Sequence, residues 1–163
     1  MNQKTIRKSD DVISGYKDST IAKLESNDCS VKALAVVNNW PYERAWSELQ
    51  TKIGRQFKHG SSSIKLIDYL SECFDPIVTE KPETKGDRWP FMFPRTILTY
   101  KKTGEKKFFK MTVGSFLKLY PTGIYYVVVK GHAFAIVNGE ILGEYSDTIK
   151  LKRIILCVFK VKN

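Results

Sequence analysis

Cysteine, histidine and long apolar runs are all scarce in this chain of 163 residues. Three widely spaced cysteines with no CxxC pair argue against a disulfide framework and against a zinc-binding cluster. Two histidines are too few for a typical structural metal site, so we expect no metal and no cofactor. No apolar run approaches the roughly 20 residues of a membrane helix, and the first residues lack the apolar core of a signal peptide. We therefore expect a cytoplasmic protein without a membrane partner.

The remaining composition is that of an ordinary globular protein, with 42% hydrophobic and 27% charged residues. A chain of this length can bury one proper core. We expect a single domain over residues 1–163. Within it, the polar residues 1–18 form either a loose arm or a first short helix.

Positive charge is in clear excess, with a formal net charge of +10. A charge of this size attracts nucleic acid, an anionic surface or an acidic partner protein. Part of it lies in a predicted hairpin between strands expected at 96–101 and 107–111, whose lysines are Lys101, Lys102, Lys106, Lys107 and Lys110. These lysines either bind a partner or only keep a solvated turn soluble. Interleaved arginine and aromatic residues, the better sign of a nucleic-acid surface, are few, so nucleic acid is only weakly supported.

The stretch 27–37 joins short polar residues to a helical apolar run, which predicts a helix over about 28–38. Asp28 is a suitable N-cap and places Cys29 in the first helical turn. Unpaired backbone N–H groups and the helix dipole favour a thiolate there, so Cys29 is a candidate nucleophile. The alternative is a small buried apolar residue. Cys73 and Cys157 are expected in the core.

Apolar spacing predicts two more helices, one ending near Gly54 and one after 60–63, and a short helix follows Thr112. Ile64, Ile67, Leu70 and Cys73 should face inward from the third helix. Proline-rich residues 75–95 indicate a long loop. The last third is rich in β-branched residues and predicts strands at 124–129, 132–137, 140–144 and 150–161, with Asn138-Gly139 as a hairpin turn. The predicted fold class is α+β, with N-terminal helices packed on a C-terminal antiparallel sheet.

Two segments resemble the papain-like cysteine peptidase superfamily, and in particular small bacteriophage-type proteins of that kind. Residues 27–35 match N-D-C-x-x-[KR]-A-[LI]-A, and residues 121–139 match P-x-G-x-Y-x-V-x-x-x-G-H-x-x-A-[VI]-[VI]-[ND]-G. The resemblance implies a papain-like fold with the cysteine on a helix start. It also implies Cys29 as nucleophile and His132 as general base, acting on a peptide or protein substrate.

A third catalytic residue can be sought from the hairpin register. If Asn138 and Gly139 form the turn, His132 faces position 145, and position 147 shares its face of the sheet. Asp147 is then the first choice to orient His132, and Glu144 is the alternative on the other face. The related proteins carry an aspartate where this chain has Gly143, which is a departure from their pattern.

The resemblance leaves the oxyanion donors and the activity open. Papain-like enzymes use a glutamine where this chain has Lys23, so the backbone N–H of Cys29 and the side chain of Asn27 are the candidates. Asn27 is alternatively a plain capping residue. One hypothesis is a phage-type cysteine peptidase or related thiol hydrolase. The other is an inactive papain-like fold that binds a host protein or nucleic acid through its basic surface, in the host cytoplasm.

Overall fold

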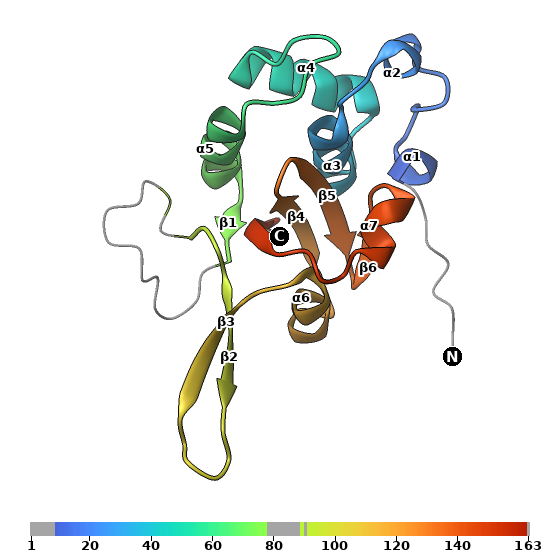
Figure 1. Cartoon of the computed structure of the whole chain (residues 1–163). Coiled ribbons are helices and arrows are strands. Elements are labelled where there is room, and N and C mark those ends of the chain that lie inside the picture. The colour runs from blue at the N-terminus through green and yellow to red at the C-terminus, as the bar shows by residue number, and fades with distance from the viewer. Residues whose placement is uncertain (1–8, 78–88, 90, 163) are drawn as a thin grey trace.

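Helices dominate the first half of the chain and strands the second half, which confirms the α+β class (Figure 1). The structure is a computed structural model and describes residues 9–77, 89 and 91–162. The helices are α1 (Ser9–Val12), α2 (Thr20–Leu24), α3 (Cys29–Asn38), α4 (Tyr42–Ile53), α5 (Ser63–Cys73), α6 (Val113–Leu119) and α7 (Tyr145–Ile149). The strands are β1 (Asp75–Pro76), β2 (Arg95–Thr99), β3 (Lys106–Lys110), β4 (Ile124–Val129), β5 (His132–Val137), β6 (Glu140–Leu142) and β7 (Ile155–Lys160).

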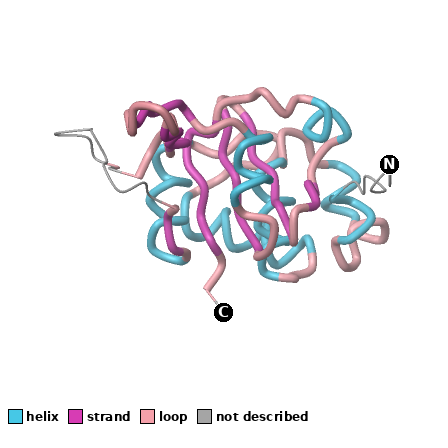
Figure 2. Tube along the Cα trace, turned by 90° about the horizontal axis from the view of Figure 1, so that it is seen from below, coloured by secondary structure: helices cyan, strands magenta, loops and turns pink. Residues whose placement is uncertain are grey.

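The main sheet is antiparallel, with the strand order β1-β7-β4-β5-β6. Both of its faces are covered: α3, α4 and α5 lie on one side and α6 on the other (Figure 1; Figure 2 shows the strands from below). Alternate residues of β4 enter the two cores, with Tyr126 and Val128 on the α3 side and Tyr125 and Val127 on the α6 side. Burial on both faces explains why this strand is a continuous apolar run rather than an alternating one.

Helix α3 is the central helix and packs against β5, β4 and α4. It is buried almost all round, because its buried residues Val31, Ala33, Leu34, Ala35 and Val37 point to more than one side. The predicted helix over about 28–38 is confirmed. Asp28 occupies the N-cap position, but its side chain makes no cap hydrogen bond and instead accepts one from the Tyr42 hydroxyl at 2.7 Å.

Helix α5 buries a different face from the predicted one. Ile67 and Leu70 are buried as expected, but Ile64 is 53% exposed and Cys73 is also exposed. Leu66 and Tyr69 take their places in the core. The prediction that Cys73 belongs to the core is therefore wrong, whereas Cys157 is buried in β7 as predicted.

The C-terminal third differs from the prediction after the hairpin. Asn138 and Gly139 form the turn, with Val137 opposite Glu140. The returning strand ends at Leu142 rather than at residue 144, and residues 145–149 form helix α7. The last strand is correspondingly shorter, over Ile155–Lys160.

Two further segments can be compared with their predictions. Of the alternatives for residues 1–18, the structure has a short helix, α1, followed by the buried Ile13, and residues 1–8 lie outside the described part. The predicted loop at 75–95 begins with β1, which pairs with β7, and residues 78–88 and 90 are outside the described part. Over the described ranges, we find no helix long and apolar enough to cross a membrane.

Candidate active site

Cys29 and His132 come from distant parts of the sequence and meet beside one cavity of about 550 Å³. Cys29 is the first residue of α3 and His132 is the first residue of β5, so the packing of α3 on β5 brings them together. The two residues line the same cavity, and Cys29 is one of the groups that raise the pKa of His132. Both side chains are partly exposed, so a ligand in the cavity can reach them.

The imidazole of His132 also binds Asp147. Its Nε2 lies 2.9 Å from Oδ2 of Asp147, which is only 1% exposed. Two more donors hold this buried carboxylate: the backbone N–H of Glu144 at 2.8 Å from Oδ2, and Nη1 of Arg153 at 2.9 Å from Oδ1. The carboxylate is thus fixed at both oxygens and presents one of them to His132.

This environment keeps His132 positively charged. The hydrogen bond to Asp147 and then that to Cys29 raise the pKa of His132 to about 10, although burial opposes the rise. The ring is therefore an imidazolium at neutral pH, and its Nε2–H donates to Asp147.

Gly143 gives the Asp147 carboxylate its space. A Cβ built at position 143 would lie on Oδ2 of Asp147 and 2.8 Å from Cβ of Phe134, both closer than real side chains allow. Glycine at 143 and an aspartate reaching back from 147 therefore belong together. The chain thus has a glycine at 143 and supplies the carboxylate that binds His132 from position 147.

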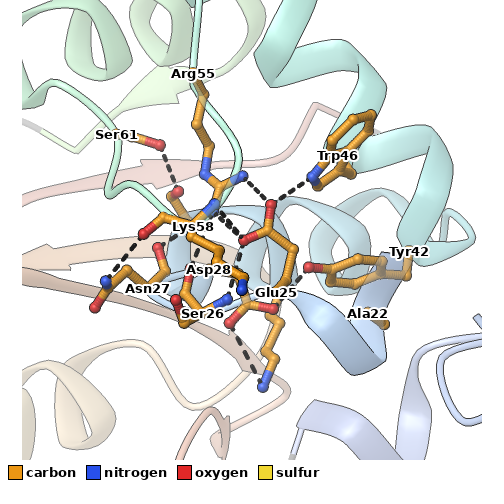
Figure 3. Close-up of polar contacts among 12 residues, drawn as sticks. Ala22, Glu25, Ser26, Asn27, Asp28, Tyr42, Trp46, Arg55, Lys58 and Ser61 are labelled. Carbon is orange, nitrogen blue, oxygen red and sulfur yellow. Dashed lines mark hydrogen bonds and ion pairs between the residues drawn. The ribbon is translucent and has the colours of Figure 1, made fainter. Parts of the chain in front are cut away.

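The loop that leads into Cys29 is built around a buried ion pair between Glu25 and Arg55 (Figure 3). Arg55 donates from both of its terminal nitrogens to the Glu25 carboxylate, at 2.9 and 3.1 Å, and Trp46 donates from Nε1 at 2.6 Å. The backbone N–H groups of Ser26 and Lys58 also donate to it.

Burial on its own would raise the pKa of Glu25, but the hydrogen bonds from Arg55 and Trp46 outweigh it and lower the pKa to about 2. The carboxylate is therefore charged at neutral pH. Arg55 lies near the backbone oxygens of Ser26 and Asn27 as well, at 3.4 Å each. The ion pair and its neighbours thus tie residues 25–27, which lead into α3, to residues 55–58, which follow α4.

The cavity has a polar end and an apolar wall. Its apolar lining includes Ile64 and Ile67 from α5 together with Trp89 and Met92. Ile64, exposed in the fold, is therefore part of this wall. These apolar side chains line the same cavity as Cys29 and His132.

The remaining predicted residues fall into two groups. Asn27 and Glu144 line the cavity. Asn27 has a left-handed backbone (φ 52°), and its Nδ2 donates a hydrogen bond to the Lys58 carbonyl at 3.2 Å. Glu144 is exposed and is the N-cap residue of α7. Their roles as oxyanion donor and alternative acid stay predictions. The predicted lysines at 101, 102, 106, 107 and 110 are not among the residues that line the cavity.

Asp147 reaches His132 by a different route from the predicted one. The hairpin register predicted Asp147 on an extended strand that faces His132, with Tyr145 directly opposite the histidine. That placement is wrong because the strand ends at Leu142, and Asp147 lies in the first turn of α7.

Sequence reasoning missed Arg153, Glu25 and Arg55, because no motif or spacing links them to the cysteine or the histidine. Within the described ranges, no group of three or more His, Cys, Asp or Glu residues is placed to hold a metal ion. Comparison of this chain with protein families, with curated proteins and with solved structures finds no match.

Proposed function

We propose that this protein is a thiol hydrolase of the papain-like kind, acting on an amide or isopeptide bond of a peptide or protein. The observation that carries the proposal is that His132 lines the same cavity as Cys29 and binds the buried Asp147 carboxylate through Nε2 at 2.9 Å. Nucleophile, base and orienting acid are the three roles that such chemistry requires, in that spatial order. The cysteine on a helix start and the histidine at the start of an antiparallel strand are consistent with the resemblance in the sequence.

In the proposed reaction, the Cys29 thiolate adds to the carbonyl carbon of the substrate. The His132 imidazolium gives its proton to the departing amine as the C–N bond breaks, which leaves an acyl thioester on Cys29. The neutral imidazole then takes a proton from water while the oxygen of that water attacks the thioester. The C–S bond breaks, the acid is released, and the thiolate and imidazolium are restored. Asp147 keeps the ring oriented and stabilises its positive charge throughout.

The test needs no knowledge of the substrate, because the chain supplies a matched control thiol. Cys73 is exposed on α5 and Cys157 is buried, so Cys73→Ser leaves Cys29 as the accessible thiol and Cys29→Ser leaves Cys73. Reaction with 2,2′-dithiodipyridine at pH 5 should be at least about tenfold faster for Cys29, because an unassisted thiol is almost entirely protonated at that pH. Adding His132→Ala to the Cys73→Ser protein should abolish the advantage.

Turnover is tested on a library of protein-derived peptides analysed by mass spectrometry for new termini. Cys29→Ser and His132→Ala should each remove the cleavage, and the double variant should be hardly worse, since members of a catalytic unit are non-additive. If Cys29 reacts no faster than Cys73 at pH 5, the hydrolase proposal fails. The same fold would then serve as a binding protein.

A further inference from the structure

The β2–β3 hairpin stands apart from the rest of the molecule. Its strands pair with each other, from Arg95 opposite Lys110 to Thr99 opposite Lys106. In the part of the chain that the structure describes, they pair with no strand of the main sheet. It extends away from the body of the protein as an arm (Figure 1). An isolated two-stranded ribbon is only marginally stable in water, so its exposed side chains call for a reason.

The arm concentrates the positive charge of the protein. Residues 95–110 contain six basic residues and one acidic residue, a net charge of +5, which is half of the +10 carried by the whole chain. Within the described residues, none of its five lysines forms an ion pair with a carboxylate. The charge of these five lysines is therefore available to an anionic partner.

Exposed apolar side chains lie among these lysines. Leu98, Tyr100 and Phe109 are 50%, 43% and 46% exposed, and Leu98 is directly opposite Lys107. The Lys107 ammonium lies 5.2 Å from the centre of the Tyr100 ring. At the tip, Tyr100, Lys101, Lys102, Thr103, Glu105 and Lys107 line a hollow of about 350 Å³. The fold thus brings aromatic and basic groups together where the sequence suggested few such neighbours.

We propose that this arm binds single-stranded nucleic acid, with its lysines on the phosphates and the Tyr100 ring stacked on a base. Lysines alone would explain a soluble turn, and an acidic protein partner would need only the charge. Exposed rings interleaved with unpaired lysines match the combination of backbone neutralisation and base stacking that single strands require. The bases of a duplex are already stacked on each other, so the ring favours the single strand.

The experiment measures fluorescence anisotropy of a fluorescein-labelled 20-mer DNA of mixed sequence, as a single strand and as a duplex, in 50 to 200 mM salt. The wild-type protein should bind the single strand more tightly. Neutralising three or four phosphates predicts a slope of log affinity against log salt of about −2 to −3. Tyr100→Ala should weaken single-strand binding by about 5-fold or more, and Lys102→Gln should make the slope less steep by about 0.7.

Matched controls lie elsewhere on the surface. Phe57→Ala removes an exposed ring that also has a lysine over it, and Lys118→Gln removes one charge from α6. Both variants should bind like the wild type. The dithiodipyridine reactivity of Cys29 reports separately on the folded body, so this proposal and the hydrolase proposal can fail independently. Absence of binding at 50 mM salt, or tighter binding to the duplex, would overturn the proposal. If poly-L-glutamate displaces the labelled strand as well as unlabelled single-stranded DNA does, and Tyr100→Ala does not change the affinity, the arm would instead be assigned to an acidic protein partner.

Discussion

Substituting Gly143 by alanine should disconnect Asp147 from His132 without touching either residue. The new Cβ would collide with Oδ2 of Asp147 and lie 2.8 Å from Cβ of Phe134. Phe134 is fully buried in β5 and cannot give way easily, so the carboxylate is the group that must move. Overpacking of this kind destabilises the native state by about 1–3 kcal/mol. That loss is small enough for most proteins of this size to stay folded.

The expected effect on the site is larger than the effect on folding. The bond to Asp147 is the largest reason for the raised pKa of His132, so its loss should bring that pKa down from about 10 toward the ordinary 6.5. Displacement of a positioning group by about 1 Å can cost roughly 100-fold in rate. We therefore expect Gly143→Ala to reduce turnover by about that factor at neutral pH.

The assay is an NMR titration of the His132 ring, alongside the thiol reaction rate of Cys29 and chemical denaturation. Gly60→Ala is the matched control, because it adds the same methyl group at the same cavity and its Cβ meets no atom within 4 Å. Gly143→Ala should lower the pKa of His132 and Gly60→Ala should leave it near 10. If a folded Gly143→Ala protein keeps that pKa and the reaction rate of the control, Asp147 does not hold His132 in the way described.

Three further predictions concern the groups around the site. Iodoacetamide at pH 7 should label Cys29 and spare Cys157, because burial covers Cys157 and raises its pKa to about 12; peptide mapping that finds Cys157 labelled in the folded protein would contradict this. Glu25 has a pKa of about 2 in the folded protein against an ordinary value of 4.5. Its contribution to the stability of the fold is therefore complete above pH 4.5 and is lost as the pH falls toward 2. The loss should be about 3 kcal/mol of unfolding free energy. In chemical denaturation at a series of pH values, the unfolding free energy of Glu25→Gln should fall less steeply below pH 4.5 than that of the wild type. Arg153→Met should lower turnover while Arg153→Lys restores part of it, since the side chain acts by holding Asp147; equal turnover of the wild type and Arg153→Met would refute that role.

Local signals were sufficient to place the two central residues. The change from polar residues to an apolar run marks the start of α3 and therefore the position of Cys29, although the Asp28 side chain makes no cap hydrogen bond. The Asn138-Gly139 turn fixed the register of the β5–β6 hairpin as predicted. The α+β class also followed from the change in periodicity along the chain.

Predictions failed where a segment could satisfy two patterns. Helix α5 carries apolar residues on overlapping faces, and its contacts with α4 and β1 decided that Leu66 is buried while Ile64 and Cys73 are not. The alternation of side chains along an extended strand predicted that Asp147 lies on such a strand. The strand instead gives way to α7, and the backbone N–H of Glu144 binds the Asp147 carboxylate.

By itself, the sequence determined the helix that carries Cys29, the strand that carries His132 and the excess of positive charge. Only the tertiary structure decided which groups complete the site. Arg55 lies 30 positions from Glu25, and Arg153 reaches Asp147 from beyond α7. Helix starts and tight turns depend on interactions between residues close in sequence, and these can be read from the chain. A buried carboxylate finds its partners only when distant segments pack together, and no local pattern encodes that meeting.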